Sequence, residues 1–290
     1  MRYEGTVYRP PSEANSLLIQ ATIGCPHNRC TFCGMYKNKK FRVRPLQEIK
    51  EDLLSALEYY GPGVRSLFFP DGNTIVMKTA DLVEAIEYAH RLFPRLERVT
   101  VYGSARFLVR KPLKDLKLLR EAGLNRIHSG MESGDDVVLE KIQKGASAAE
   151  IIAAGLRVKE AGIEISQYML LGIGGVERWQ EHARESARVL SAIDPHFIRL
   201  RTYTPVPRTP LGQEYLKGDF KLPSPHGILW ELRLFIENLE GSGWLLSDHI
   251  SNYVNVNGQL PHDREAMLAL VDKALSIDES YFQQHDYRYL

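Results

Sequence analysis

Cysteine is scarce in this sequence. Only three occur in 290 residues, and all of them lie between positions 25 and 33. An odd, clustered set in a chain that opens without a signal peptide argues against a framework of disulfides. Metal binding or redox chemistry is the role that such a cluster predicts.

Long hydrophobic runs are also missing. No apolar stretch reaches the roughly 18 residues that a membrane-spanning helix needs, and the opening MRYEGTVYRPPSEANS holds no apolar signal region. We therefore expect a cytoplasmic protein with no membrane partner. An excess of one charge is absent as well, because the formal net charge is only +1. That balance argues against nucleic acid as a partner.

Apolar, β-rich runs alternate with helical patterns. The expected strands are 16–24, 65–70, 98–103, 125–130, 164–171 and 196–203, and the expected helices are 46–60, 79–92, 112–121, 135–143, 148–161 and 178–193. This alternation predicts right-handed parallel βαβ units. Six units predict an α/β fold, a partial (β/α)6 barrel over residues 1–211. Residues 212–290 are expected to form a helical C-terminal extension that closes the barrel, with helices near 225–240 and 263–277 around an irregular stretch.

Glycine-rich polar turns follow five of the expected strands, at 24–25, 71–74, 103–104, 130–134 and 172–175. Ligands of parallel α/β sheets bind at the carboxyl ends of the strands. Five such turns at the same end predict a ligand site there.

The cysteine motif reads Cys25-Pro-His-Asn-Arg-Cys30-Thr-Phe-Cys33. Three thiolates offer soft donors that suit either zinc or an iron–sulfur cluster. Zinc needs a fourth ligand, and His27 could supply it. A cluster held by three cysteines instead keeps one iron open for a small molecule. The position of the loop, directly after the first strand of a βα barrel, favours the cluster.

The loop resembles the cluster loop of the radical S-adenosylmethionine (SAM) superfamily, although the cysteines here are separated by four and two residues rather than three and two. The resemblance covers about residues 16–211. It points to the branch of the elongator catalytic subunit, the tRNA methylthiotransferases and coproporphyrinogen dehydrogenase. It implies an anaerobic enzyme of radical SAM partial-barrel type, in which Cys25, Cys30 and Cys33 hold a [4Fe–4S] cluster.

The same resemblance implies SAM as the second cofactor, cleaved reductively to methionine and a 5′-deoxyadenosyl radical that abstracts hydrogen from a substrate. Glu132 and Ser133 would meet the ribose, Phe32 the adenine, and the turn at 71–74 the amino group of SAM. Lys144 would meet its carboxylate, or is a solvated lysine near a helix end. The implied cofactor contacts are Phe32, Gly72, Asn73, Thr74, Ser104, Glu132, Ser133, Lys144 and Arg201.

Alternation along the strands places Arg199 and Arg201 on one face of the strand at 196–203. That face is expected to line the barrel interior, which would favour a polar small-molecule substrate carrying a carboxylate or phosphate. The alternative is that these arginines pair with interior acids such as Glu132. His128 is expected to be a hydrogen-bonded core histidine.

Two further stretches carry polar groups. Lys37, Lys39, Lys40, Arg42 and Arg44 either form a solvated turn or dock an acidic electron donor, flavodoxin or ferredoxin. The polar segment 247–253 either is a capped turn or supplies catalytic groups, His249 and Tyr253, as proton donors or substrate contacts.

Three hypotheses follow. The first is a radical SAM enzyme acting on a polar, anionic substrate. The second is an iron–sulfur or zinc module without catalysis. The third is an RNA-modifying radical SAM enzyme, against which stand the lack of cysteines for a second cluster and the lack of an evident RNA-binding domain.

Overall fold

The computed structural model describes residues 1–283, which divide into two compact units. The first unit comprises residues 1–28, 35–129 and 156–165. The second comprises residues 29–34 and 130–155 and the chain from residue 166 on. Eight strands form the main sheet in the order β1-β4-β5-β6-β7-β8-β9-β10.

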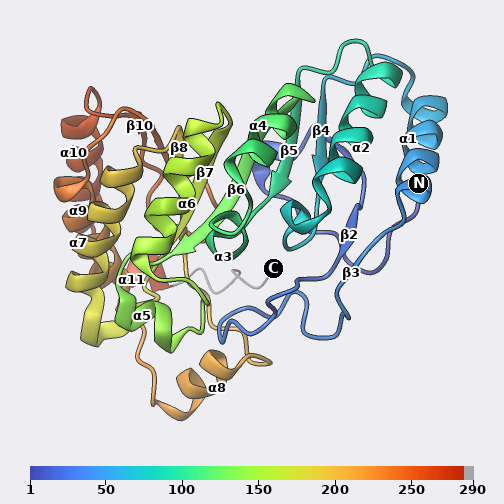
Figure 1. Ribbon diagram of the computed structural model, residues 1–290. Helices are drawn as coiled ribbons and strands as arrows, with labels where there is room; N and C mark the ends of the chain where they lie inside the picture. The colour runs from blue at the N-terminus through green and yellow to red at the C-terminus, as the bar shows by residue number, and fades with distance from the viewer. Residues whose placement is uncertain (284–290) are drawn as a thin grey trace. The chain divides into compact units, whose positions relative to one another are not determined.

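The first unit contains parallel strands joined by helices. Its strands are β1 (Leu17–Leu18), β4 (Ser66–Phe69), β5 (Arg98–Tyr102) and most of β6 (Leu124–Glu132), which pair in parallel. The helices α1 (Leu46–Tyr60), α2 (Thr79–Leu92) and α4 (Leu113–Glu121) lie side by side (Figure 1). Short elements occupy the strand ends: η1 (Pro11–Glu13), η2 (Thr74–Val76) and α3 (Ala105–Leu108).

The second unit continues the pattern. Most of β7 (Glu164–Leu171) pairs in parallel with β8 (Phe197–Thr202), and β8 pairs in parallel with β9 (Trp244–Leu246). Strand β10 (Asn257–Gln259) is antiparallel to β9. The helices are α5 (Asp136–Lys141), part of α6 (Ala148–Glu160), α7 (Gly175–Ile193), α8 (Pro210–Lys217), α9 (Pro225–Asn238), α10 (Arg264–Leu275) and α11 (Ser280–Gln283), with α7, α9 and α10 side by side (Figure 1).

The alternating pattern predicted the main strands and helices but not the short helices α3, α8 and α11, and two of its expectations were wrong. The expected strand at 16–24 is in fact two, because the chain leaves the main sheet at Gln20. Beyond that point β2 (Thr22–Ile23) pairs antiparallel with β3 (Arg42–Val43) in a sheet of its own. The stretch expected to be irregular contains β9 and β10, which are too short for a recognisable period. The extension is therefore not purely helical.

The N-terminal segment buries a carboxylate within the first unit. Glu13, at the end of η1, is fully buried, and its Oε1 lies 3.0 Å from Nε2 of His128. Its Oε2 accepts a hydrogen bond from Ser16 at 2.6 Å and lies 3.4 Å from Nη2 of Arg98. Burial alone would raise the pKa of Glu13, but the hydrogen bonds from His128 and Ser16 hold it below its ordinary value. His128 is a hydrogen-bonded core residue, as predicted.

Replacing Glu13 by alanine should lower the free energy of unfolding by about 3 kcal/mol at pH 7, because it strips the buried partners of a carboxylate. Urea denaturation measures this loss. The folded pKa of Glu13 is depressed, so its contribution is present above the unfolded pKa and disappears as the pH falls through the folded pKa. Wild type and variant should therefore converge in acid.

The matched control is Glu4→Ala, which removes an exposed ion pair with Arg42 from the same segment. Such a pair contributes less than about 1 kcal/mol. Equal losses in the two variants would contradict a structural role for Glu13.

Candidate functional site

The turn after β4 clasps the residue that precedes the first cysteine. Asp71 accepts hydrogen bonds at Oδ2 from the backbone N–H of Gly24, at 2.8 Å, and from the side chain of Gln20, at 3.1 Å. The N–H of Gly72 donates back to the carbonyl of Gly24 at 3.0 Å. Burial raises the pKa of Asp71. These bonds, all within the first unit, fix the backbone next to Cys25.

Gly72 allows the turn to touch Cys25. A β-carbon added at Gly72 would lie 2.6 Å from the β-carbon of Cys25 and 3.0 Å from its sulfur. Backbone cannot approach a side chain this closely unless the residue is glycine. Gly72 is also the only residue of 71–74 that is not buried.

Asn73 and Thr74 are buried, and their side chains form hydrogen bonds within the chain. Asn73 is 3% exposed; its Oδ1 accepts from the N–H of Ser104 at 2.6 Å, and its Nδ2 lies 3.7 Å from the sulfur of Cys25. The hydroxyl of Thr74 donates to the carbonyls of Phe69 and Pro70. The side chains of Asn73 and Thr74 are thus engaged within the chain, and the contact of this turn with the amino group of SAM stays a prediction. Ser104 is partly exposed.

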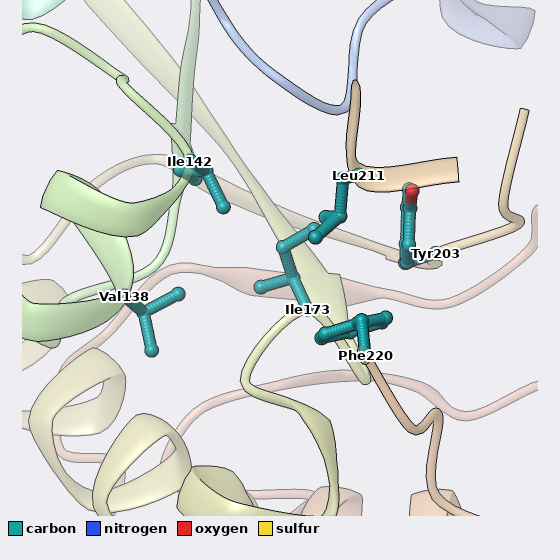
Figure 2. Packing of buried hydrophobic residues seen from close by; sticks show 6 residues of the cluster. All are labelled: Val138, Ile142, Ile173, Tyr203, Leu211 and Phe220. Carbon is teal, nitrogen blue, oxygen red and sulfur yellow. The ribbon is translucent and has the colours of Figure 1, made fainter. Parts of the chain in front are cut away.

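The second half of the cysteine loop belongs to the second unit. Thr31 donates its N–H to the carbonyl of Ile142 at 3.0 Å and accepts at its own carbonyl from the N–H of Leu211, also at 3.0 Å. Phe32 packs against the apolar cluster that Figure 2 shows, in which the labelled side chains point toward one another. That cluster is Val138, Ile142, Ile173, Tyr203, Leu211 and Phe220. The dipeptide between Cys30 and Cys33 is thus anchored beside α5 and α8.

All three cysteines are partly exposed. Cys25 belongs to the first unit, whereas Cys30 and Cys33 belong to the second. Among residues 1–283, no group of three His, Cys, Asp or Glu side chains is arranged to hold a metal ion. Ligation of a metal cluster by these cysteines is therefore inferred from the motif and from the family reported below.

Glu132 and Lys144 form an ion pair in the second unit. Their side chains meet at 2.8 Å and are 13% and 11% exposed. Glu132 adopts a left-handed backbone conformation, with φ of 68°. The pair occupies the space beside Gly130, where an added β-carbon would lie 2.1 Å from Oε1 of Glu132. The Lys144 ammonium also lies 5.9 Å from the centroid of the Phe32 ring. Three residues predicted from sequence as cofactor contacts therefore gather in one place.

Ser133 points elsewhere. It is fully buried, and its hydroxyl lies 2.8 Å from Nδ1 of His182 and accepts from the N–H of Asp135 at 3.0 Å. Ser133 thus fixes the start of α5 against α7, and the ribose contact at Glu132 and Ser133 stays a prediction. His182 could not be predicted from the sequence, because a lone histidine on a helix carries no distinctive signal.

A buried acid, Glu231 on α9, lies close to His182. Its Oε1 accepts a hydrogen bond from the N–H of Gly172 at 2.9 Å. The same oxygen lies 3.4 Å from Nε2 of His182. Burial raises the pKa of Glu231 to about 8 and lowers that of His182 to about 4. Burial therefore favours the neutral form of both side chains, and their hydrogen bonds tie the ends of β6 and β7 to α7 and α9.

Arg199 and Arg201 lie on one face of β8, as the strand alternation predicts. Ile198 and Leu200 are buried at 2% and 1% exposure, while Arg199 and Arg201 leave the strand on the opposite side. Arg201 lies over the ring of Tyr168, 5.3 Å from its centroid. Within residues 1–283, neither arginine forms an ion pair, and the buried Nε of Arg199 has no hydrogen-bond partner. The alternative of pairing with Glu132 is wrong, because Glu132 pairs with Lys144.

The segment 247–253, which follows β9, forms hydrogen bonds with the last residues of β8. Asn252 donates to the carbonyl of Leu200 at 2.9 Å, and the N–H of Thr202 donates to the hydroxyl of Ser251 at 3.1 Å. Nδ1 of His249 lies 2.8 Å from that hydroxyl and accepts from the N–H of Ser251 at 3.2 Å. Because that N–H can only donate, Nδ1 is the acceptor and the proton of His249 is held at Nε2.

Burial and the nearby charge of Arg201 lower the pKa of His249 to about 4. His249 is therefore a neutral hydrogen-bond donor at pH 7, next to Arg201. Tyr253 is partly exposed, and its ring meets that of Phe282 edge-on at 5.9 Å between centroids.

The basic run after the cysteine loop is mostly engaged within the chain. Lys37 donates to the carbonyl of Asn28, and Lys39 donates to the carbonyls of Glu4 and Thr6. Arg42 pairs with Glu4, and Arg44 is 4% exposed and pairs with Asp52 at 2.7 Å. These contacts give most of the run a role in holding the chain together, which argues against its use as a docking patch for an electron donor.

Comparison with known proteins identifies the class. The model of the radical SAM superfamily matches residues 19–187, a span that includes all three cysteines. The chain belongs to the radical SAM superfamily, a family of enzymes.

Relatives agree with this assignment. The heme chaperone HemW of Bacillus subtilis is 21% identical over 246 residues, which is 82% of this chain and 63% of that relative's length. The structure of coproporphyrinogen III oxidase (HemN) from Escherichia coli matches with a TM-score of 0.57 at 20% identity, over 77% of this chain and 51% of that one. Methylornithine synthase (PylB) matches with a TM-score of 0.54 at 18% identity, over 92% and 84%. The predicted partial-barrel fold is thereby confirmed.

No helix among the described residues combines the length and apolar character needed to cross a membrane.

Proposed function

We propose that this chain is a radical SAM enzyme whose Cys25, Cys30 and Cys33 hold a [4Fe–4S] cluster. The observation that carries this proposal is the three-cysteine motif inside the span matched by the family model. In this family the cluster and SAM together supply one-electron cleavage of SAM to methionine and a 5′-deoxyadenosyl radical, which abstracts hydrogen from a substrate. A reductant is needed, and flavodoxin or ferredoxin would serve as the donor.

The residues around the cysteines fit such a group. The clasp at Gly24 and the glycine at position 72 hold Cys25 in place while leaving it partly exposed. Thr31 anchors the loop between the other two cysteines. Thiolates held on fixed backbone are the donors that iron–sulfur clusters require.

Glu132, Lys144 and Phe32 would bind SAM. The carboxylate of Glu132 would accept hydrogen bonds from the ribose hydroxyls, the ammonium of Lys144 would pair with the SAM carboxylate, and the ring of Phe32 offers an apolar surface for the adenine. Their closeness supports a shared ligand, since Glu132 and Lys144 meet at 2.8 Å and the Lys144 ammonium lies 5.9 Å from the centroid of the Phe32 ring. Gly72 and Ser104, both partly exposed, would add backbone and hydroxyl contacts.

The substrate would be polar and anionic. Arg201 and Arg199 leave β8 on one face without an ion-pair partner among the described residues, and His249 adds an N–H donor beside Arg201. Arginines without acids, of which Arg199 is buried, favour a bound carboxylate or phosphate. His249 and Tyr253 would contact that substrate, and the segment after residue 211 would close the barrel over it.

Each of the substitutions Cys25→Ala, Cys30→Ala and Cys33→Ala should abolish the cluster, because no fourth cysteine exists to replace a ligand. Anaerobic reconstitution should load about four irons per wild-type chain, as a [4Fe–4S] cluster requires. Reduction in the presence of SAM should then yield 5′-deoxyadenosine, which a module without catalysis would not form.

His27→Ala is the matched control within the same loop. It should retain iron and SAM cleavage. Loss of the metal in this variant would favour the zinc alternative, and full iron content in a cysteine variant would overturn the cluster assignment.

Glu132→Ala should weaken SAM binding by about tenfold to a hundredfold while iron content stays unchanged, because a partly buried carboxylate that accepts hydroxyl hydrogen bonds contributes about 1.5–3 kcal/mol. Isothermal titration of the reconstituted protein measures the dissociation constant. Glu140→Ala, an exposed acid on α5, serves as the control. An unchanged SAM affinity in Glu132→Ala would place the ribose elsewhere.

Arg201→Ala should weaken anionic ligands by at least about tenfold, the usual effect of losing a charged hydrogen bond. A thermal-shift screen in the presence of SAM should pair each carboxylate or phosphate compound with its neutral analogue, on wild type, Arg199→Ala and Arg201→Ala. Arg188→Ala removes an exposed arginine of α7 and should change nothing. Neutral or cationic hits, or anionic hits that survive both substitutions, would refute an anionic substrate.

A further inference from the structure

The Asn73 amide has one possible orientation. Its partner at 2.6 Å is the backbone N–H of Ser104, which can only donate, so the atom there is the carbonyl oxygen Oδ1. The other end of the amide is therefore the NH2 group, and it lies 3.7 Å from the sulfur of Cys25. Asn73 thus presents an N–H donor to a thiol that the family uses as a cluster ligand.

The surroundings hold this donor in place. Asn73 is 3% exposed, and its side chain is fixed at the far end by the start of α3. The sulfur cannot withdraw freely, because Gly24 is clasped by Asp71 and the backbone of Gly72 packs against the Cys25 side chain. A side-chain donor that is buried and restrained from both sides acts on the sulfur with little loss of entropy.

We propose that Asn73 is a positioning residue that hydrogen-bonds the Cys25 thiolate and raises the reduction potential of the cluster. This inference rests on the proposed ligation of a [4Fe–4S] cluster by Cys25. One-electron reduction adds a negative charge that is shared with the ligating sulfurs. A hydrogen bond to sulfur stabilises the reduced state more than the oxidised state, which makes the cluster easier to reduce.

A purely structural role predicts a different result. The bond to Ser104 joins the turn after β4 to the turn after β5, and this bridge needs only the oxygen of Asn73. Asn73→Asp keeps an oxygen for Ser104 but replaces the N–H donor by a negative charge beside the sulfur. Asn73→Ala removes both contacts. The two variants therefore separate the bridge from the effect on sulfur.

The experiment is a redox titration of the reconstituted holoenzyme with dithionite, followed by the electron paramagnetic resonance signal of the reduced cluster. At one fixed poise, Asn73→Ala should show about a tenfold lower ratio of reduced to oxidised cluster, which equals a shift of about 59 mV to more negative potential for a one-electron couple. Asn73→Asp should be reduced less readily still. Iron content and circular dichroism accompany each measurement.

The matched control is Asn125→Ala. Asn125 accepts from the backbone N–H of Val99 at 2.8 Å in the same unit, a comparable bridge between strands that involves no sulfur atom, and its loss should leave the potential unchanged. An Asn73→Asp potential equal to that of wild type would overturn the inference, as would failure of both Asn73 variants to load a cluster that Asn125→Ala loads normally. A wild-type protein that loads no [4Fe–4S] cluster would instead refute the proposed function.

Discussion

The hydrogen bond from the Gly24 backbone to Asp71 is the constraint on which the candidate site depends. It joins the residue before the first cysteine to the turn after β4, and a return bond from Gly72 closes the clasp. Because the clasp fixes backbone rather than side chain, Cys25 keeps its sulfur partly exposed while its α-carbon cannot move. The contacts of Gly72 and Asn73 with Cys25 both presuppose this fixed position.

The two ends of the cysteine loop are held by different means. At Cys25 the holding groups are side chains of a tight turn, whereas at Thr31 they are backbone carbonyl and amide groups at the end of α5 and the start of α8. The loop has four residues between its first two cysteines, and this longer part contains the passage from one unit to the other. The shorter part, Thr31-Phe32, is fixed by hydrogen bonds and by apolar packing.

Most of the strands and helices and the cysteine loop could be predicted from the sequence. Helical periodicity, glycines at the ends of helices and the spacing of the cysteines are all local signals. The strand alternation placed Arg199 and Arg201 on one face correctly. What could not be predicted depends on partners distant in sequence. The resemblance implied Asn73 and Ser133 as cofactor contacts, but it could not reveal their hydrogen bonds with Ser104 and His182. Strand β9 pairs with β8 although more than forty residues separate them in the chain. The strand itself is too short to show a periodic pattern.

The close approach of Gly72 to Cys25 couples two positions that lie far apart in the sequence. Any side chain at position 72 would occupy the space of the cysteine β-carbon. During divergence this glycine can change only if the cysteine loop takes another path, so the two features should be inherited together. In an alignment of radical SAM proteins, the residue at this position would then serve as a marker of loop path, able to sort relatives whose cysteine spacing alone is ambiguous.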